Sequence, residues 1–201
     1  MFSHPTITRP SAVRGPGVTA VAALAVLLGV ALGASGASAG KRGPFAARAG
    51  LEFAEAAARV WAQDASLVYL ENDDDVGASG VAPCWGYLFY SPGRNQARAY
   101  SVGDGRIVAA EDPGMKFDAP PVAAQWIDSE AALAAADEHG GREYCRAHAG
   151  RVGTMLLTRG TFESGTPDLT TWTVVYTSPA APSLFVVVDA AQGRFCRTWR
   201  G

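Results

Sequence analysis

Bulky apolar residues recur at every second position in several short runs of the chain. The runs 85–90 and 172–177 both begin with Trp, alternate in this way and lead into a Ser-Pro dipeptide at the same spacing. A period of two is typical of a β-strand with one buried face. These are the only Ser-Pro dipeptides in the sequence. The sequence therefore predicts two copies of one small unit.

Similar runs predict the remaining strands, which are 66–70, 97–103 and 106–110 in the first half, and 155–158, 171–177, 184–190 and one starting at Gly193 in the second. Asp104-Gly105 is a two-residue hairpin signal. The acidic segment 71–75 predicts a loop. Cys145 lies in a short segment that we also expect to be a strand.

A helix is predicted ahead of each set of strands. Residues 46–63 are amphipathic and rich in Ala. A second helix should begin at Asp128 or Ser129, whose side chains can accept from the free N–H groups of the first turn, and run to about His139. Gly140-Gly141 supplies the stop.

The predicted fold class is α+β with two tandem units, each one helix packed on an antiparallel sheet of three or four strands. The units are 40–110 and 126–201, and the Pro-containing segment 111–125 links them. One such unit is too small to bury much core alone, so we expect the two to pack together.

The N-terminal segment 1–39 is predicted to be a signal peptide. Arg9 and Arg14 precede an uncharged apolar run, and 37–39 is an Ala-Ser-Ala cleavage pattern. The mature protein would then be exported, to the periplasm or beyond, and would not be membrane-bound. The alternative is an uncleaved anchor in the inner membrane formed by residues 15–40.

The charge balance of the chain argues against anionic partners. The chain has 17 Lys and Arg against 19 Asp and Glu, with a formal net charge of −2. Without a block of basic residues, there is no electrostatic case for binding nucleic acid or an anionic membrane.

The chain has three cysteines, of which two could form a disulfide. Cys145 and Cys196 both fall in the second predicted unit, so they are the expected disulfide, and Cys84 would be left over. The alternative interpretation is that all three are buried small apolar residues.

Two segments contain residue types that bind metals. His139, Cys145 and His148 are possible zinc ligands, but their spacing fits no standard zinc pattern. The acidic segment 72–77 resembles a calcium loop, but it lacks oxygen ligands at required positions. We expect no metal and no cofactor, and keep a zinc-binding metalloprotein or enzyme using the His139/Cys145/His148 set as an alternative.

The sequence contains candidate ligand-binding residues but no catalytic motif. The chain has no Gly-x-Ser-x-Gly motif and no dinucleotide fingerprint, so we expect no catalytic residues and no enzyme. Trp85, Tyr87, Trp172 and Tyr176 are the candidate ligand-binding residues, because aromatic rings often anchor ligands. At period-two spacing, however, such aromatic residues more often face the core, and this interpretation is the stronger one.

The second half resembles the PepSY-like domain family. The resemblance rests on Trp126-x-Asp128-Ser129 before the helix, on Trp172-x-Val174-x-Tyr176, and on the segment 186–195 with its Asp and Gly. It is weaker over 49–110. The resemblance implies exported bacterial modules with a cystatin-like helix-on-sheet fold, a binding or protease-inhibitory role and no catalytic residues.

The leading hypothesis is therefore an exported, non-enzymatic module that binds an extracytoplasmic protein, peptide or small ligand. Besides the zinc alternative, a structural envelope protein tethered to the membrane by its N-terminal segment remains open.

Overall fold

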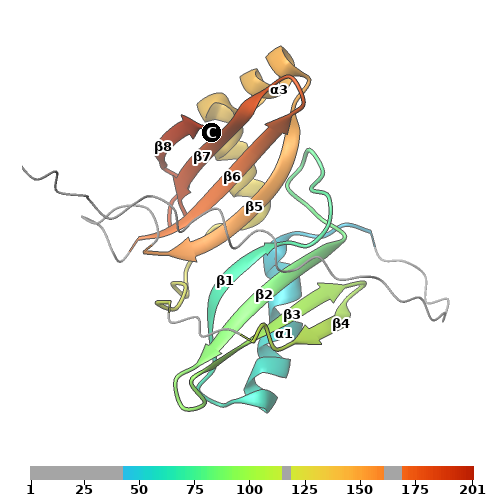
Figure 1. The fold of residues 1–201 in the computed structure, drawn as a ribbon, viewed down its shortest axis with the longest axis vertical. Helices are drawn as coiled ribbons and strands as arrows, with labels where there is room; N and C mark the ends of the chain where they lie inside the picture. The colour runs from blue at the N-terminus through green and yellow to red at the C-terminus, as the bar shows by residue number, and fades with distance from the viewer. Residues whose placement is uncertain (1–42, 115–118, 161–168) are drawn as a thin grey trace, which may run out of the picture. The chain divides into compact units, whose positions relative to one another are not determined.

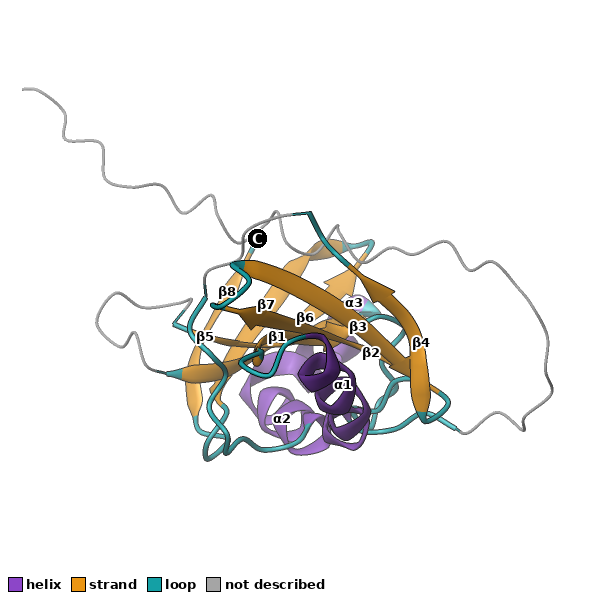
Figure 2. Ribbon diagram, turned by 90° about the horizontal axis from the view of Figure 1, so that it is seen from below, coloured by secondary structure: helices purple, strands orange, loops and turns teal. Residues whose placement is uncertain are grey.

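Eight strands form one antiparallel sheet, and the helices lie on one of its faces (Figures 1 and 2). The structure is a computed structural model that describes residues 43–114, 119–160 and 169–201. In chain order, its elements are α1 (Ala47–Trp61), β1 (Ser66–Asn72), β2 (Cys84–Ser91), β3 (Gln96–Gly103), β4 (Arg106–Glu111), α2 (Ser129–Ala136), the π-helical turn η1 (Asp137–Gly141), α3 (Arg142–His148), β5 (Arg151–Arg159), β6 (Thr170–Ser178), β7 (Ala181–Asp189) and β8 (Phe195–Arg200).

The strand order is β4-β3-β2-β1-β5-β6-β7-β8, so consecutive strands run outward from the central pair β1·β5. The expected α+β class is confirmed. The strands expected in two units, however, join into one continuous sheet. Three residue pairs form the junction, namely Tyr69↔Thr158, Leu70↔Leu157 and Glu71↔Leu156. Each neighbouring pair of strands on either side has a longer ladder.

Two local predictions were wrong. Glu71 and Asn72 are the last residues of β1 rather than part of a loop, because they pair with Gly86 and Trp85 of β2. Cys145 lies in helix α3 and not in a strand. The helical path that α2 begins continues into η1 and breaks at His139 and Gly140, where Gly140 has φ 113°, and α3 then begins at Arg142. Glycine is the residue that adopts this left-handed backbone without strain.

The N-terminal predictions lie outside the described residues. This holds for the signal peptide 1–39 and for the alternative anchor 15–40. In the part of the chain that is described, no helix has the length and apolar character needed to cross a membrane. The C-terminal part of the predicted linker 111–125 is hydrogen-bonded to the sheet. Val122 N donates to Leu67 O at 2.8 Å, and Ala123 N donates to Thr170 Oγ1 at 3.1 Å.

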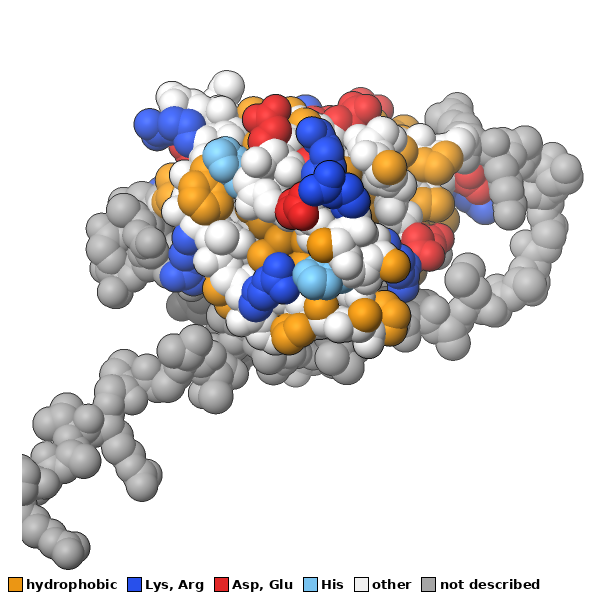
Figure 3. Space-filling model, turned by 90° about the horizontal axis from the view of Figure 1, so that it is seen from above, with side chains coloured by type: hydrophobic (Ala, Val, Ile, Leu, Met, Phe, Trp, Pro, Cys, Tyr) orange, Lys and Arg blue, Asp and Glu red, His pale blue; other side chains and the backbone are white. Residues whose placement is uncertain are grey.

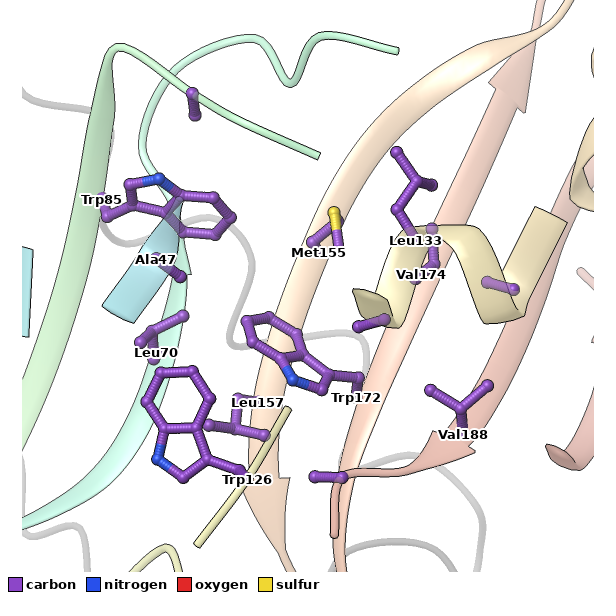
Figure 4. Close-up of a cluster of buried hydrophobic side chains, with 14 of the residues drawn as sticks. Ala47, Leu70, Trp85, Trp126, Leu133, Met155, Leu157, Trp172, Val174 and Val188 are labelled. Atoms are coloured by element: carbon purple, nitrogen blue, oxygen red, sulfur yellow. The ribbon is translucent and has the colours of Figure 1, made fainter. Parts of the chain in front are cut away.

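The core lies between the helices and the sheet, and tryptophans occupy its centre (Figure 4). The rings of Trp85 and Trp172 meet edge-to-face with centroids 6.3 Å apart, and Trp126 meets Trp172 in the same way at 5.9 Å. Such arrangements add to the stabilisation from apolar burial. The cluster crosses the β1·β5 junction, because Trp85 belongs to β2 and Trp172 to β6.

Each of these strand tryptophans also binds the chain just before a helix. Trp85 Nε1 donates to Phe45 O and Trp172 Nε1 to Ile127 O, both at 2.8 Å. Phe45 lies two residues before α1, and Ile127 lies two residues before α2. The repeated Trp therefore performs the same task twice, which is to fix where a helix enters the core.

A single pair of polar side chains caps both helices. Asp128 Oδ1 accepts from Ser129 N of α2 at 2.8 Å and from Arg48 N of α1 at 3.0 Å. Ser129 Oγ accepts from Ala47 N at 3.0 Å. Free N–H groups at helix N-termini need such acceptors, and a carboxylate also favours the positive end of the helix dipole.

Glycine permits the closest helix-to-sheet contacts. A Cβ atom at Gly50 of α1 would lie 2.3 Å from the Tyr87 hydroxyl, and one at Gly141 would lie 2.1 Å from that of Tyr176. Both tyrosine hydroxyls use this space to reach acceptors on the helix side, Ala47 O at 2.6 Å and Asp137 Oδ1 at 2.7 Å.

Replacing Asp128 should destabilise the protein more than loss of an ordinary helix cap does. Asp128→Ala removes the acceptor of N–H groups in two helices, so we expect a loss of about 2–3 kcal/mol in the free energy of unfolding, measured by urea titration. Asp128→Asn keeps an oxygen acceptor and should lose less than half as much. Equal losses for the two variants would contradict a capping role.

We call strands β1 to β4 and strands β5 to β8 the two arms of the sheet. The contact between Trp85 and Trp172 across the junction should couple the stabilities of the two arms. Trp85→Phe and Trp172→Phe are each expected to lower the free energy of unfolding by about 2–4 kcal/mol, because each leaves a carbonyl without its donor and a gap in the core. In the double variant, the losses should depart from additivity by about 0.5–1.5 kcal/mol, as for aromatic pairs in contact. Strict additivity in chemical denaturation would show that the arms are independent.

Candidate functional site

The four candidate ligand-binding residues are all inside the protein. Trp85, Tyr87, Trp172 and Tyr176 have 0% exposed surface. Their polar atoms are already bonded to carbonyl or carboxylate oxygens of the helix side. The expectation of a ligand-facing aromatic surface is corrected here, because alternation in strands β2 and β6 points these rings at the helices.

The alternative zinc ligands do not converge. His139 is stacked on Phe195 with ring centroids 4.5 Å apart, whereas His148 Nε2 lies 3.3 Å from Arg200 Nη1. On the face that Figure 3 draws, the histidine surface forms separate patches. Cys145 is half-buried, and burial raises the pKa of its thiol. Within the described ranges, no three His, Cys, Asp or Glu side chains are grouped to hold a metal ion.

The cysteines are thiols in the structure, so the expected Cys145–Cys196 disulfide is not formed. Cys145 is half-buried on helix α3 and does not lie in the expected strand. Cys196 is exposed and lies in the register shift at the start of β8. A disulfide needs Cβ atoms that face each other at about 4 Å.

The acidic segment does not form a calcium loop. Asn72 is used inside the sheet, where its Oδ1 accepts from Met155 N of β5 at 2.7 Å. Asp75 forms an exposed ion pair with Arg151 at 2.8 Å. These oxygens have protein partners, and the described residues gather no metal-binding group at this place.

The sheet face without helices carries a polar cluster that the sequence interpretation missed. It consists of Tyr69, Glu71, Asp73, Cys84 and Ser101, and we call it the β1 polar cluster. Tyr69 and Glu71 alternate with core-facing Leu70 along β1, so their side chains point to the opposite face. The cluster lies beside the β1·β5 junction.

Glu71 is the most buried acid of this cluster, with 5% of its surface exposed. The Tyr69 hydroxyl donates to Glu71 Oε2 at 2.5 Å. Burial raises the pKa of Glu71 to about 7, and the nearby charge of Asp73 adds to the rise, while the Tyr69 hydrogen bond opposes it. Glu71 therefore binds a proton at mildly acidic pH.

Asp73 completes the cluster next to a glycine. A Cβ atom at Gly86 would lie 2.5 Å from Asp73 Oδ1, so only glycine leaves room for this carboxylate. Burial raises the pKa of Asp73, although hydrogen bonds from Ser101 and Cys84 lower it in part. Asp73 Oδ1 is buried without a hydrogen-bond partner. An unpaired buried oxygen favours the protonated carboxyl.

The chemistry of the cluster is proton exchange and polar recognition. Burial and the neighbouring acids raise the pKa of the Cys84 thiol to about 12, so Cys84 is not a thiolate nucleophile at neutral pH. The hydroxyl of Tyr69 is likewise held neutral by burial, which raises its pKa. Tyr69, Glu71 and Asp73 occur at every second position, and this alternation of polar residues is the feature of the sequence that could have predicted the cluster.

Comparisons with known proteins add little. No protein-family model and no curated protein match the chain. Among solved structures, it is similar to the C-terminal domain of YpeB from Bacillus megaterium, with 8% sequence identity, 80% of this chain and 67% of that chain covered, and a TM-score of 0.31. Similarity at this level supports no statement about fold or function, so the PepSY resemblance remains a proposal.

Replacing Glu71 by Gln should reduce the pH dependence of stability. The folded-state pKa of about 7 exceeds the ordinary 4.5, so the folded protein binds this proton more tightly than the unfolded chain does. The wild-type free energy of unfolding should therefore fall by about 1.4 kcal/mol per pH unit as pH rises from 4.5 to 7, on the order of 3 kcal/mol in total.

Urea unfolding across this pH range measures the effect. Glu71→Gln should show a shallower slope and exceed the wild type in stability at pH 8, with Asp73 responsible for the remaining slope. Glu52→Gln, on an exposed position of α1, is the matched control and should keep the wild-type slope. Parallel curves for wild type and Glu71→Gln would contradict the raised pKa.

Proposed function

We propose that this protein is an exported, non-enzymatic binding module built from two tandem PepSY-like units. The units are residues 40–110 and 126–201, with 111–125 as the link. The strand order supports this, because β1 to β4 extend from the sheet centre on one side and β5 to β8 on the other. Each set follows a helix that packs on the same face, α1 or α2 (Figure 2).

The repeated tryptophan is the observation that carries the proposal. Trp85 and Trp172 occupy the second strand of each set and bind the residue two positions before the corresponding helix. Six residues after each Trp, a serine organises the following turn. Ser91 Oγ accepts from Arg94 N at 3.1 Å, and Ser178 Oγ accepts from Ala180 N at 3.0 Å. Shared sequence and shared contacts at these positions fit a duplicated unit.

A binding role fits the polar side chains better than catalysis does. In the β1 polar cluster, the thiol and the phenol stay protonated at neutral pH, so neither supplies a nucleophile. Carboxyl groups at this surface are suited to accepting hydrogen bonds from donors on a partner. The partner would be an extracytoplasmic protein, peptide or small ligand.

The helix-free face beside the end of β1 is the proposed contact surface. Asp74 and Asp75 are exposed there and follow the buried Glu71 and the half-buried Asp73 in the chain. The exposed carboxylate of Asp74, beside that of Asp75, favours a partner with basic side chains. Because the family that the chain resembles is associated with protease inhibition, a secreted peptidase is the first partner to test.

The proposal predicts stoichiometric inhibition of a peptidase by the exported protein. The protein recovered outside the cytoplasm should begin at Gly40 by mass spectrometry. Titrated against a panel of secreted peptidases, it should abolish the activity of at least one enzyme near a one-to-one ratio. Asp74→Arg should weaken this inhibition about tenfold or more, because it places a positive charge where basic groups are expected to bind.

Glu52→Arg is the matched control, since it makes the same charge change at an exposed position on α1, away from the helix-free face. It should inhibit like the wild type. Absence of inhibition across the panel would overturn the inhibitory form of the proposal, and equal weakening by both variants would overturn the contact surface.

A further inference from the structure

Strand β4 leaves one edge of the sheet open. It is the terminal strand of the order, and among the described residues no strand pairs with its outer side. Its sequence is Arg-Ile-Val-Ala-Ala-Glu, and Val108 in the middle is 50% exposed. Uncovered strand edges with apolar centres are templates for pairing with another strand.

The hairpin turn determines which backbone groups of β4 face outward. Asp104 and Gly105 have φ of 55° and 71°, as in a type I′ turn, and they join the flanking pair Gly103↔Arg106. This flanking pair is hydrogen-bonded, and the pairs along β3 then alternate. The register shifts between Ser101 and Val102, so Val108 is an extra residue of β4 at a bulge. Ile107 opposite Val102, and Ala110 opposite Tyr100, therefore direct their N–H and C=O groups away from β3.

A second copy of the chain satisfies these groups in one register. In an antiparallel pair of β4 strands, Ile107 of one copy must lie opposite Ala110 of the other, and the reverse, with the bulges at Val108 of both copies between these two pairs. The same register places Arg106 opposite Glu111 at both ends. Both charged side chains lie on the helix-free face, because their β3 partners Gly103 and Ala99 alternate with core-facing Tyr100 and Val102. We propose that the protein forms a homodimer through antiparallel pairing of β4 with β4 of a second copy.

The opposite edge of the sheet lacks this self-complementarity. Strand β8 contains Arg197 and Arg200 and no acidic residue. A second β8 strand would therefore offer no acidic residue to face these arginines, and like charges across strands are unfavourable. The charge pattern thus selects β4 and not β8 for self-association.

The proposed interface is short, with six residues from each strand. It is smaller than a standard protein interface, so we expect a dissociation constant on the order of 10–1000 μM. The inference does not depend on the proposed peptidase inhibition, because it rests on the open edge of β4 and is tested by self-association alone.

Sedimentation velocity on the protein as purified from its host tests the dimer. The wild type should shift from monomer to dimer as its concentration rises from about 10 μM to 1 mM, consistent with the expected affinity. Arg106→Glu and Glu111→Arg should each weaken dimerisation at least tenfold, since each variant pairs like charges with itself. A one-to-one mixture of the two variants should associate like the wild type, because opposite charges then meet at both ends.

The double variant Arg106→Glu/Glu111→Arg exchanges the two charges and should also dimerise like the wild type. Folding of every variant is checked by circular dichroism. If a single variant folds poorly, the double variant still tests whether opposite charges at these two positions support the dimer. A wild type that stays monomeric at 1 mM, a dimer that survives both single variants, or a mixture and a double variant that fail to associate would each overturn the proposal.

Discussion

The fold depends on how two arms of a sheet are held together at a short junction. Strands β1 and β5 share three residue pairs, which is little backbone pairing for an eight-stranded sheet. Packing beneath the sheet compensates, because Trp85, Trp126 and Trp172 contact one another across the junction. Asp128 then joins the N-termini of two helices at the same place. Large aromatic burial and shared helix caps thus replace strand hydrogen bonds.

This arrangement decides which side chains are left outside the core. The aromatic residues are needed to hold the arms together, so they are unavailable for a ligand. The helix-free face bears the β1 polar cluster instead, and Glu71 of that cluster also pairs within the junction. Protonation of Glu71 is therefore coupled to the stability of the junction, because its charged form is disfavoured by burial.

Sequence patterns predicted most elements but not every assignment. Alternation located the strands that contain Trp85 and Trp172, and the amphipathic pattern located α1. The same reasoning placed Glu71 in a loop, because acidic residues usually avoid strands. It also placed Cys145 in a strand, since the seven-residue helix α3 is too short for a clear period. Both errors concern segments whose conformation depends on neighbours distant in sequence.

By itself, the sequence determined the α+β class, the positions of the Trp strands and the helix start at Asp128, because periodicity and capping act over a few residues. Only the tertiary structure decided that all strands share one sheet and that Glu71 is a buried acid with a raised pKa. It also decided that the aromatic rings are core rather than ligand surface. Strand pairing and desolvation are set by residues far apart in the chain, and no local pattern encodes them.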